Sequence, residues 1–331
     1  GSVGGGSSSL AKKIGLKIES LATSNLINGQ ICYLTYTATS GTESDGSNMD
    51  DRLTVSWVIS EVVGDSQVDY QKGTIDVNTG VTAQFEFGTK LRDNTTSVIT
   101  MWAEGLNSGA SNKKTQRVTT AELKLTESAN FSNLKYYRPD GLTLQCNAIG
   151  AMDKILEFYF DDELIDSRDL TANDSNYQEQ KVPESKATHG SHLCRMELYQ
   201  GIRNGSKVTK GLHAGTIEFE VGVVATGNMT PVIWLGNYKE EYYNYDNIQI
   251  PYIVYNPAST NSAIVNLKKN GVEIASSPRT IDTSTIKWNY FEITDAQMGL
   301  INRYSIGCLD TERSIMFTVI QDPTRKMEYM K

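Results

Sequence analysis

The stretch 158-FYFDDELIDSRDL-170 reads as a β-strand, a two-residue turn and a returning strand. A second stretch, 265-VNLKKNGVEIASSPRTI-281, has the same order, with Asn270-Gly271 where the first has Asp161-Asp162. Asp, Asn and Gly tolerate the left-handed backbone that tight hairpin turns need, and Asn-Gly between alternating runs is a strong hairpin signal. The two stretches therefore predict the same β-hairpin twice in one chain.

The repetition extends beyond the hairpins. Each hairpin is followed by an alternating strand that begins with Gly and then by a closing strand, and the first third of the chain ends with two similar strands. The strand pairs are 190-GSHLCRMELYQG-201 with 216-TIEFEV-221, 299-GLINRYSIGCLD-310 with 313-RSIMFTV-319, and 97-SVITMWAEG-105 with 116-QRVTTAELKL-125. The same order of elements thus occurs three times, which indicates three copies of one structural unit.

This order resembles the immunoglobulin-like (Ig-like) β-sandwich, with its C–C′ hairpin, F strand and closing G strand. Helical periodicity is nearly absent, and about seven short strands per hundred residues is typical of such sandwiches. The resemblance implies an all-β fold of three tandem Ig-like β-sandwich domains, placed at 14–126, 127–224 and 228–321. Laid end to end, three such units would reach roughly 100 Å.

The two ends of the chain differ from the repeating part. Residues 1–13 begin with 1-GSVGGGSSS-9 and are expected to be a flexible linker or tag. Residues 322–331 are expected to be a tail or the start of a further segment. We therefore expect the chain to be a fragment of a longer protein.

The composition argues against several classes of function. A net charge of −8 over 331 residues makes a phosphate-binding basic surface, and so a nucleic-acid partner, unexpected. No apolar run approaches the roughly 20 residues that span a bilayer, so no membrane insertion is predicted. No nucleophile elbow, Walker loop or dinucleotide fingerprint is present, so neither a catalytic residue nor a cofactor is predicted.

Three polar clusters invite a chemical interpretation but have simpler ones. His189 and His192 enter a predicted strand without a visible set of further ligands, so solvated loop histidines are favoured over a metal site. The run 45-DGSNMDD-51 lacks the alternating carboxylates of a calcium loop. Asp161 and Asp162 occupy a hairpin turn, where Asp is favoured for backbone reasons. We predict no metal site.

The four cysteines bear on the compartment in which the protein assembles. Cys146 and Cys194 lie on the second and sixth strands of the middle domain, where the resemblance implies an inter-sheet disulfide. Cys32 and Cys308 occupy similar strands of the other two domains without a partner. Buried reduced thiols are therefore favoured, and a Cys146–Cys194 bridge stays open as the alternative.

A cluster of tyrosines in 238–255 is the candidate interaction surface. In 248-IQIPYIVY-255 alternate residues face the core, and Pro251 marks an edge position or a bulge because it cannot donate a ladder hydrogen bond. Tyr238, Tyr242, Tyr243 and Tyr245 precede this strand in a polar segment. Packing at a domain junction, a protein interface and glycan binding are the three interpretations, in that order of preference.

The resemblance also suggests a setting for the protein. The chain is similar to the tandem Ig-like modules of tailed-bacteriophage virion proteins, which implies a non-enzymatic structural or adhesive component of a tail, fibre or head. The expected partners are other virion proteins or further copies of the chain, and then a host-surface protein or glycan. The alternatives are a bacterial cell-surface or secreted adhesin or scaffold, and an accessory carbohydrate-binding segment of a larger enzyme.

Overall fold

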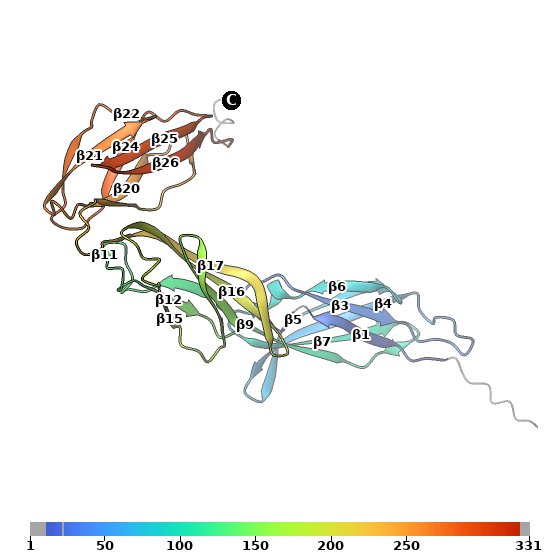
Figure 1. Cartoon of the computed structure of the whole chain (residues 1–331). Coiled ribbons are helices and arrows are strands. Elements are labelled where there is room, and N and C mark those ends of the chain that lie inside the picture. The colour runs from blue at the N-terminus through green and yellow to red at the C-terminus, as the bar shows by residue number, and fades with distance from the viewer. Residues whose placement is uncertain (1–10, 22, 325–331) are drawn as a thin grey trace, which may run out of the picture.

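A computed structural model describes residues 11–21 and 23–324, and nearly all regular structure in this part of the chain is β-strand. The strands form three β-sandwiches in succession, each with a three-stranded sheet packed against a larger sheet. Figure 1 shows the first two sandwiches end to end, whereas the third turns back at a bend. The prediction of three tandem Ig-like sandwiches is confirmed, but the straight end-to-end arrangement is wrong.

The first sandwich shows the strand order that all three share. Its strands are β1 (Gly15–Leu21), β2 (Asn25–Ile27), β3 (Tyr33–Thr39), β4 (Arg52–Val63), β5 (Ser66–Asn78), β6 (Thr82–Glu86), β7 (Thr96–Gly105), β8 (Gly109–Ala110) and β9 (Lys114–Ala121), with a short 3-10 helix at Gly88–Lys90. The sheets run β1-β3-β6 and β2-β9-β7-β4-β5, and β8 pairs with β7. The entering chain thus crosses from one sheet to the other, because β1 is antiparallel to β3 while β2 is parallel to β9.

The second sandwich repeats this order. Its strands are β10 (Lys124–Glu127), β11 (Tyr136–Tyr137), β12 (Thr143–Ile149), β13 (Lys154–Phe160), β14 (Glu163–Leu170), β15 (Tyr177–Lys181), β16 (Gly190–Asn204) and β17 (Lys207–Val223). The sheets run β10-β12-β15 and β11-β17-β16-β13-β14, with β11 parallel to β17. The alternation of β12 buries Leu144, Cys146 and Ala148 in the core, as its sequence predicts.

The third sandwich has the same plan. Its strands are β18 (Val232–Leu235), β19 (Glu241–Tyr243), β20 (Ile248–Tyr255), β21 (Ser262–Lys269), β22 (Val272–Glu273), β23 (Arg279–Asp282), β24 (Asn289–Ile293), β25 (Ile301–Cys308) and β26 (Thr311–Ile320). The sheets run β18-β20-β24 and β19-β26-β25-β21-β22, with β23 paired to β21. Pro251 therefore lies on a central strand and not at an edge. Its carbonyl accepts from Gly236 N–H beyond the end of β18, so the missing Pro N–H faces no strand.

The predicted hairpin turns are confirmed by their backbone angles. Asp161 and Asp162 have φ of 50° and 63° between β13 and β14, and Asn270 and Gly271 have 49° and 78° between β21 and β22. Two consecutive residues with positive φ are what a two-residue turn of this kind requires.

The ends of the sandwiches differ in detail from the predicted limits. The predicted end of the first domain at 126 falls inside β10, which pairs with β12 of the second sandwich. The run 116–125 reads as one alternating strand, but Glu122 and Leu123 carry the chain from one sandwich to the next. Lys12 lies inside the predicted linker, yet its carbonyl accepts a hydrogen bond from Thr42 N–H and its own N–H donates to Thr42 Oγ1. The rest of that linker up to residue 10, and the tail from 325, lie outside the described residues.

Candidate functional site at the sandwich junctions

The junction between the first and second sandwiches is held by Gln200 at the end of β16. Its side chain is 1% exposed, and Nε2 donates to the Asn25 carbonyl and to Gln30 Oε1, both at 2.9 Å. Ile27 of β2 packs against the core of the second sandwich. A buried amide that is hydrogen-bonded across a junction fixes the geometry, because separation would leave its donors unpaired.

The junction between the second and third sandwiches is built around Trp234 of β18. Its indole ring is fully buried, and Nε1–H donates to the Asn133 carbonyl of the second sandwich at 2.8 Å. The ring lies against Gly222 of β17, where an added Cβ would come within 2.4 Å of Trp234 Cζ3. The surrounding residues, which we call the junction cluster, are Val224, Val232, Trp234 and Ile253, with Tyr136, Tyr255, Ile286 and Trp288 packed against them.

An ion pair between these two sandwiches lies beside the junction cluster. Arg313 of β26 forms a two-point contact with the Glu220 carboxylate of β17. The same guanidinium donates to Ser191 Oγ at 2.8 Å and to the Ile233 carbonyl at 3.1 Å. Planar, bidentate contacts of this kind restrict orientation as well as distance. The second and third sandwiches are therefore joined by both apolar packing and a directed charge pair.

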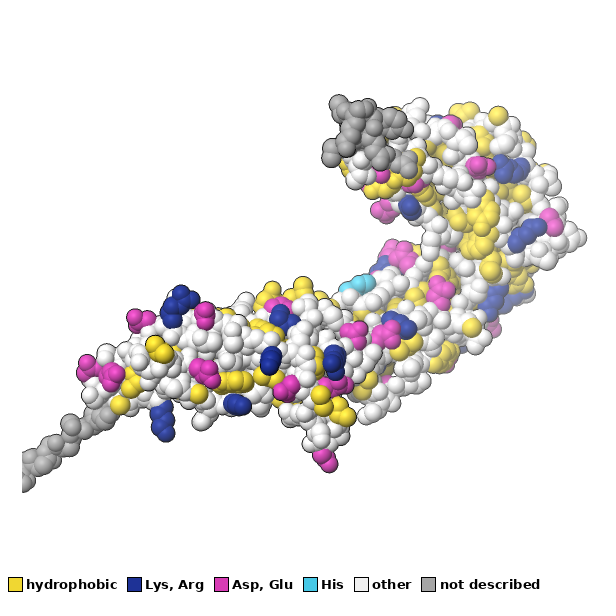
Figure 2. Space-filling view, turned by 180° about the vertical axis from the view of Figure 1, so that it is seen from behind, with side chains coloured by type: hydrophobic (Ala, Val, Ile, Leu, Met, Phe, Trp, Pro, Cys, Tyr) yellow, Lys and Arg dark blue, Asp and Glu magenta, His cyan; other side chains and the backbone are white. Residues whose placement is uncertain are grey.

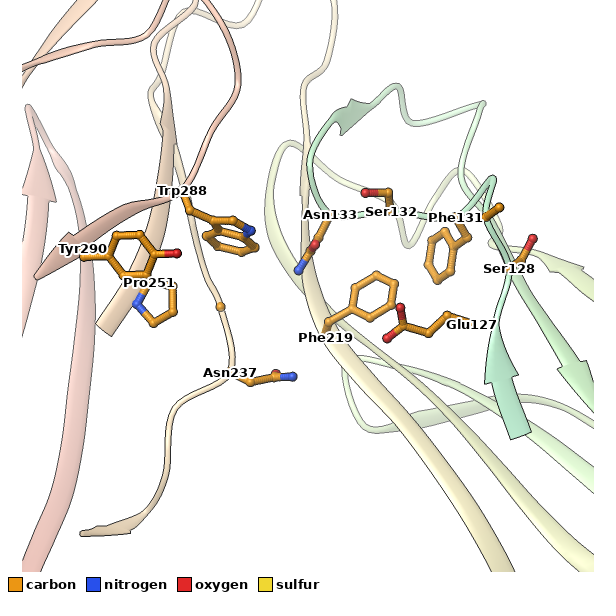
Figure 3. A pocket seen from close by; sticks show the side chains of 12 residues that line it. Glu127, Ser128, Phe131, Ser132, Asn133, Phe219, Asn237, Pro251, Trp288 and Tyr290 are labelled. Atoms are coloured by element: carbon orange, nitrogen blue, oxygen red, sulfur yellow. The ribbon is translucent and has the colours of Figure 1, made fainter. Parts of the chain in front are cut away.

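A cleft of about 630 Å³ opens next to this junction (Figure 3), a volume within the range of small-molecule sites. Trp288 and Tyr290 lie on one wall with Pro251, and Phe131 and Phe219 lie on the other. The remaining lining residues are Glu127, Ser128, Ala129, Ser132, Asn133, Gly236 and Asn237. Figure 2 shows hydrophobic side chains gathered on the surface where the second and third sandwiches meet.

The floor of the cleft depends on a glycine. A Cβ on Gly236 would come within 2.7 Å of Pro251 Cβ and 3.2 Å of Trp288 Cη2. Because a side chain would collide with Pro251 and crowd Trp288, glycine lets the chain pass this close to the aromatic wall. The cleft therefore owes its shape to the backbone between β18 and β19.

The four candidate tyrosines do not form one surface. Tyr242 is 7% exposed and packs edge-on against Phe317 at 5.2 Å, and Tyr238 is half-buried against the core of the third sandwich. Tyr243 and Tyr245 are exposed and stacked, with ring centroids 5.6 Å apart. Tyr238 and Tyr242 therefore do not belong to the expected interaction surface, because their rings pack against the core of the third sandwich. An interaction through Tyr243 and Tyr245 stays a prediction.

All four cysteines are buried in the structure, and Cys146 and Cys194 are not joined by a disulfide. Cys146 of β12 and Cys194 of β16 face the same core of the second sandwich. Burial raises the pKa of the Cys146 thiol to about 12 and raises that of Cys194 as well. Both thiols are therefore protonated at neutral pH and act as small apolar side chains.

The histidines near this region make structural contacts. His189 Nδ1 accepts from Ala225 N–H at 3.1 Å, so Nε2 donates to the Thr230 carbonyl at 2.7 Å. His192 contacts Asp161 Oδ2 at 2.6 Å. His189 thus fastens the segment that links the second and third sandwiches, and His192 supports the first predicted hairpin.

The acidic groups weighed from the sequence also have structural partners. Asp162 pairs with Arg195 at 2.7 Å. Asp50 is buried and accepts hydrogen bonds from Ser108 and Asn107. The hydrogen bond from Ser108 is the main cause that holds the pKa of Asp50 below its usual range. Within residues 11–21 and 23–324, no three His, Cys, Asp or Glu side chains gather as a metal site would require.

The aromatic wall was not identified from the sequence, although it left a signal. In 286-IKWNYFEI-293, Phe291 and Ile293 face the core. Tyr290 lies on the other side of the edge strand β24, and Trp288 directly precedes that strand. Large aromatic side chains on the outer side of an otherwise alternating edge strand indicate a covered or binding face. Their position opposite Phe219 depends on the junction and could not be read from the strand itself.

Comparison with known proteins adds the following. No family model matches the chain, and no curated protein sequence matches it. Among solved structures, the fibronectin(III)-like modules of Clostridium thermocellum CbhA match at 15% identity over 63% of this chain and 94% of theirs, with a TM-score of 0.31. A three-Ig segment of titin with E-to-A substitutions matches at 12% identity over 93% and 98%, with a TM-score of 0.33. The FN1–FN3 domains of chicken CNTN1 match at 10% identity over 93% and 99%, with a TM-score of 0.25. Matches at this level carry no argument about function.

No helix in the part of the chain that the structure describes is long and apolar enough to cross a membrane.

Proposed function

We propose that the chain is a non-enzymatic structural and adhesive component of a bacteriophage virion, in which three Ig-like sandwiches form an arm with a fixed bend. Tandem modules of this class are generally structural or adhesive. The observation that carries the proposal is that both junctions are held by buried, directed contacts. Gln200 joins the first pair of sandwiches, and Trp234 with Arg313 joins the second.

These contacts suit an arm better than a flexible chain of beads. Flexible linkers rich in Gly and Ser let modules move independently. Here only Glu122 and Leu123 separate β9 from β10, and the longer segment between β17 and β18 is fastened by His189. An arm of this design holds the outer surfaces of its sandwiches in a constant relation to one another.

The state of Cys146, Cys194 and Cys308 supports assembly in a reducing compartment. Cys146 and Cys194 share one core without a bridge, and Cys308 is buried without a cysteine partner. Secreted and cell-surface proteins tend to oxidise such pairs, whereas virions assemble in the cytoplasm before release. This supports the virion over a secreted adhesin as the setting of the arm.

The complete gene and its neighbours test the setting. Capsid or tail genes on either side are the expected result. A signal peptide upstream together with a cell-wall anchor downstream would overturn the virion assignment and favour a surface adhesin. Non-reducing mass spectrometry of protein from its native source adds a second test, in which a Cys146–Cys194 bridge would contradict assembly in the cytoplasm.

A further inference from the structure

We infer that the cleft between the second and third sandwiches binds a neutral saccharide, with one sugar ring stacked on the Trp288 and Tyr290 wall. The inference rests on the proposed function only in taking the arm to be adhesive. It assigns a ligand class and a binding site to the arm, and an experiment can contradict it without contradicting the proposed arm.

The aromatic rings on the two walls of the cleft differ in how far they are already packed. Phe131 and Phe219 on one wall are already paired, with centroids 4.8 Å apart, and are 4% and 7% exposed. Trp288 is only partly buried and Tyr290 is 50% exposed, and neither ring has an aromatic partner among the described residues. The rings on the Phe131 and Phe219 wall are therefore already packed against each other, whereas the Trp288 and Tyr290 wall presents open ring faces to the cleft (Figure 3).

The Trp288 ring is held in place by its neighbours. One side of its ring packs against the junction cluster, and Gly236 backbone lies beneath its edge. A ring that is fixed on one side and open on the other loses little conformational entropy when a ligand covers it. Unused exposed aromatic side chains on flexible loops would not have this property.

Several polar side chains at the cleft have no hydrogen-bond partner among the described residues. Within residues 11–21 and 23–324, the side chains of Glu127, Asn133, Asn237 and Tyr290 and the indole N–H of Trp288 make no hydrogen bond. In Figure 3 the Asn133 and Asn237 amides extend into the space between the walls. Aromatic faces combined with a few unpaired amide, carboxylate and hydroxyl groups are the lining that a ring with an apolar face and a polar rim needs.

The charges of the lining residues favour an uncharged ligand over an anionic one. The described residues that line the cleft include Glu127 but no Lys, Arg or His. A neighbouring hollow shares Phe219, Gly236 and Asn237 with the cleft, and its lining also lacks a basic residue. A phosphate or a sugar carboxylate would find no basic side chain on the cleft walls and would meet the Glu127 carboxylate, so the cleft fits uncharged sugars and disfavours acidic ones.

The test uses the full chain and isothermal titration calorimetry. The probes are neutral disaccharides (maltose, cellobiose, lactose and chitobiose) and two acidic ones (sialyllactose and digalacturonate). We expect at least one neutral sugar to bind and neither acidic sugar to give measurable binding. Extending the bound sugar to a longer chain distinguishes a surface polysaccharide, whose internal units must also enter the cleft, from a small free sugar.

Variants assign binding to the cleft. Tyr290→Ala and Trp288→Ala are each expected to weaken binding by about tenfold, which corresponds to about 1.4 kcal/mol and lies within the range of a stacking contact. Trp102→Ala is the matched control, because Trp102 lies on the outer face of β7 in the first sandwich, far along the chain from the cleft. Tyr290→Ala decides the question if Trp288→Ala disturbs the junction cluster.

The outcomes separate the two proposals. Silence of the wild type towards every neutral sugar, preference for the acidic probes, or binding that survives both cleft substitutions would overturn the saccharide inference. Binding of a hydrophobic peptide or dye in place of all sugars would also overturn it. X-ray scattering of the same samples tests whether the arm has a fixed bend. A fixed shape without sugar binding would support the proposed arm and contradict the saccharide inference. Sugar binding by a flexible chain would contradict the proposed arm alone.

Discussion

Replacing Trp234 by Ala should free the third sandwich from the second without unfolding either. The Trp234 ring is fully buried, but it lies in the junction cluster and outside the hydrophobic cores of the sandwiches themselves. Removing it opens the contact with Gly222 and leaves the Asn133 carbonyl without its donor. The substitution should therefore lower the free energy that couples the second and third sandwiches more than the free energy of unfolding of either sandwich alone.

The size of the effect follows from the buried ring. Burying an aromatic side chain removes about 150–250 Å² from water, which at about 25 cal/mol per Å² amounts to about 4–6 kcal/mol as an upper bound. Measured Trp→Ala truncations in cores cost about 3–5 kcal/mol. The Asn133 residue is only partly buried, so its carbonyl can regain a hydrogen bond from water. We expect a loss of about 3–5 kcal/mol of coupling free energy.

Small-angle X-ray scattering and calorimetry together measure this loss. The wild type should scatter as one bent body of fixed shape, and its second and third sandwiches should unfold in a single transition. Trp234→Ala should increase the maximum dimension, broaden the distance distribution and split that transition. Trp102→Ala is the matched control and should change neither readout, with a cost of less than about 1 kcal/mol.

A Trp234→Ala variant with the scattering curve and melting profile of the wild type would show that the junction cluster does not hold the bend. A uniform loss of folded signal in the third sandwich would also contradict this role of the junction cluster, because the ring would then belong to that sandwich's own core.

Three further substitutions test other parts of the structure. Gly73→Ala places a Cβ within 2.6 Å of Trp57 Cζ2 and should destabilise the first sandwich by about 1–3 kcal/mol in urea unfolding; an unchanged midpoint would show that the strands move apart freely. Gln200→Ala removes both hydrogen bonds to the first sandwich, including that to Asn25, and should cost about 1–3 kcal/mol and loosen that junction in scattering, whereas unchanged scattering would contradict its role. Burial raises the Cys146 pKa from 9.0 to about 12. Between these values the unfolded state releases the thiol proton while the folded state keeps it, so the free energy of unfolding is at its full value below pH 9 and falls as pH rises towards 12. Relative to Cys146→Ala, the wild type should therefore lose up to about 1.4 kcal/mol per pH unit in that window, and parallel stability curves would contradict it.

The fold could be predicted because its signals are local. Alternation over a few residues assigns the strands, and the paired turns at Asp161-Asp162 and Asn270-Gly271 assign the hairpins. The repeated order then indicates the same topology three times. The sequence does not mark the limits of the sandwiches, because the alternating pattern continues through Glu122 and Leu123, where the chain leaves one sandwich for the next.

The tyrosine prediction shows where local reasoning ends. Tyr242 and Tyr243 are neighbours in the same polar segment, yet one packs in a core and the other is exposed. Alternation separates them once the strand β19 is known, but three residues paired in parallel with β26 give little signal in the sequence.

By itself, the sequence determined that this protein is three β-sandwiches with buried cysteines and no evident catalytic motif, because each of those features is written in residues a few positions apart. Only the tertiary structure decided the bend and the cleft. Trp234 meets Asn133 across 101 residues of sequence, and Arg313 meets Glu220 across 93. A pattern with a period of two residues carries no information about contacts over such distances, so the site that they create appears only when the sandwiches are placed against each other.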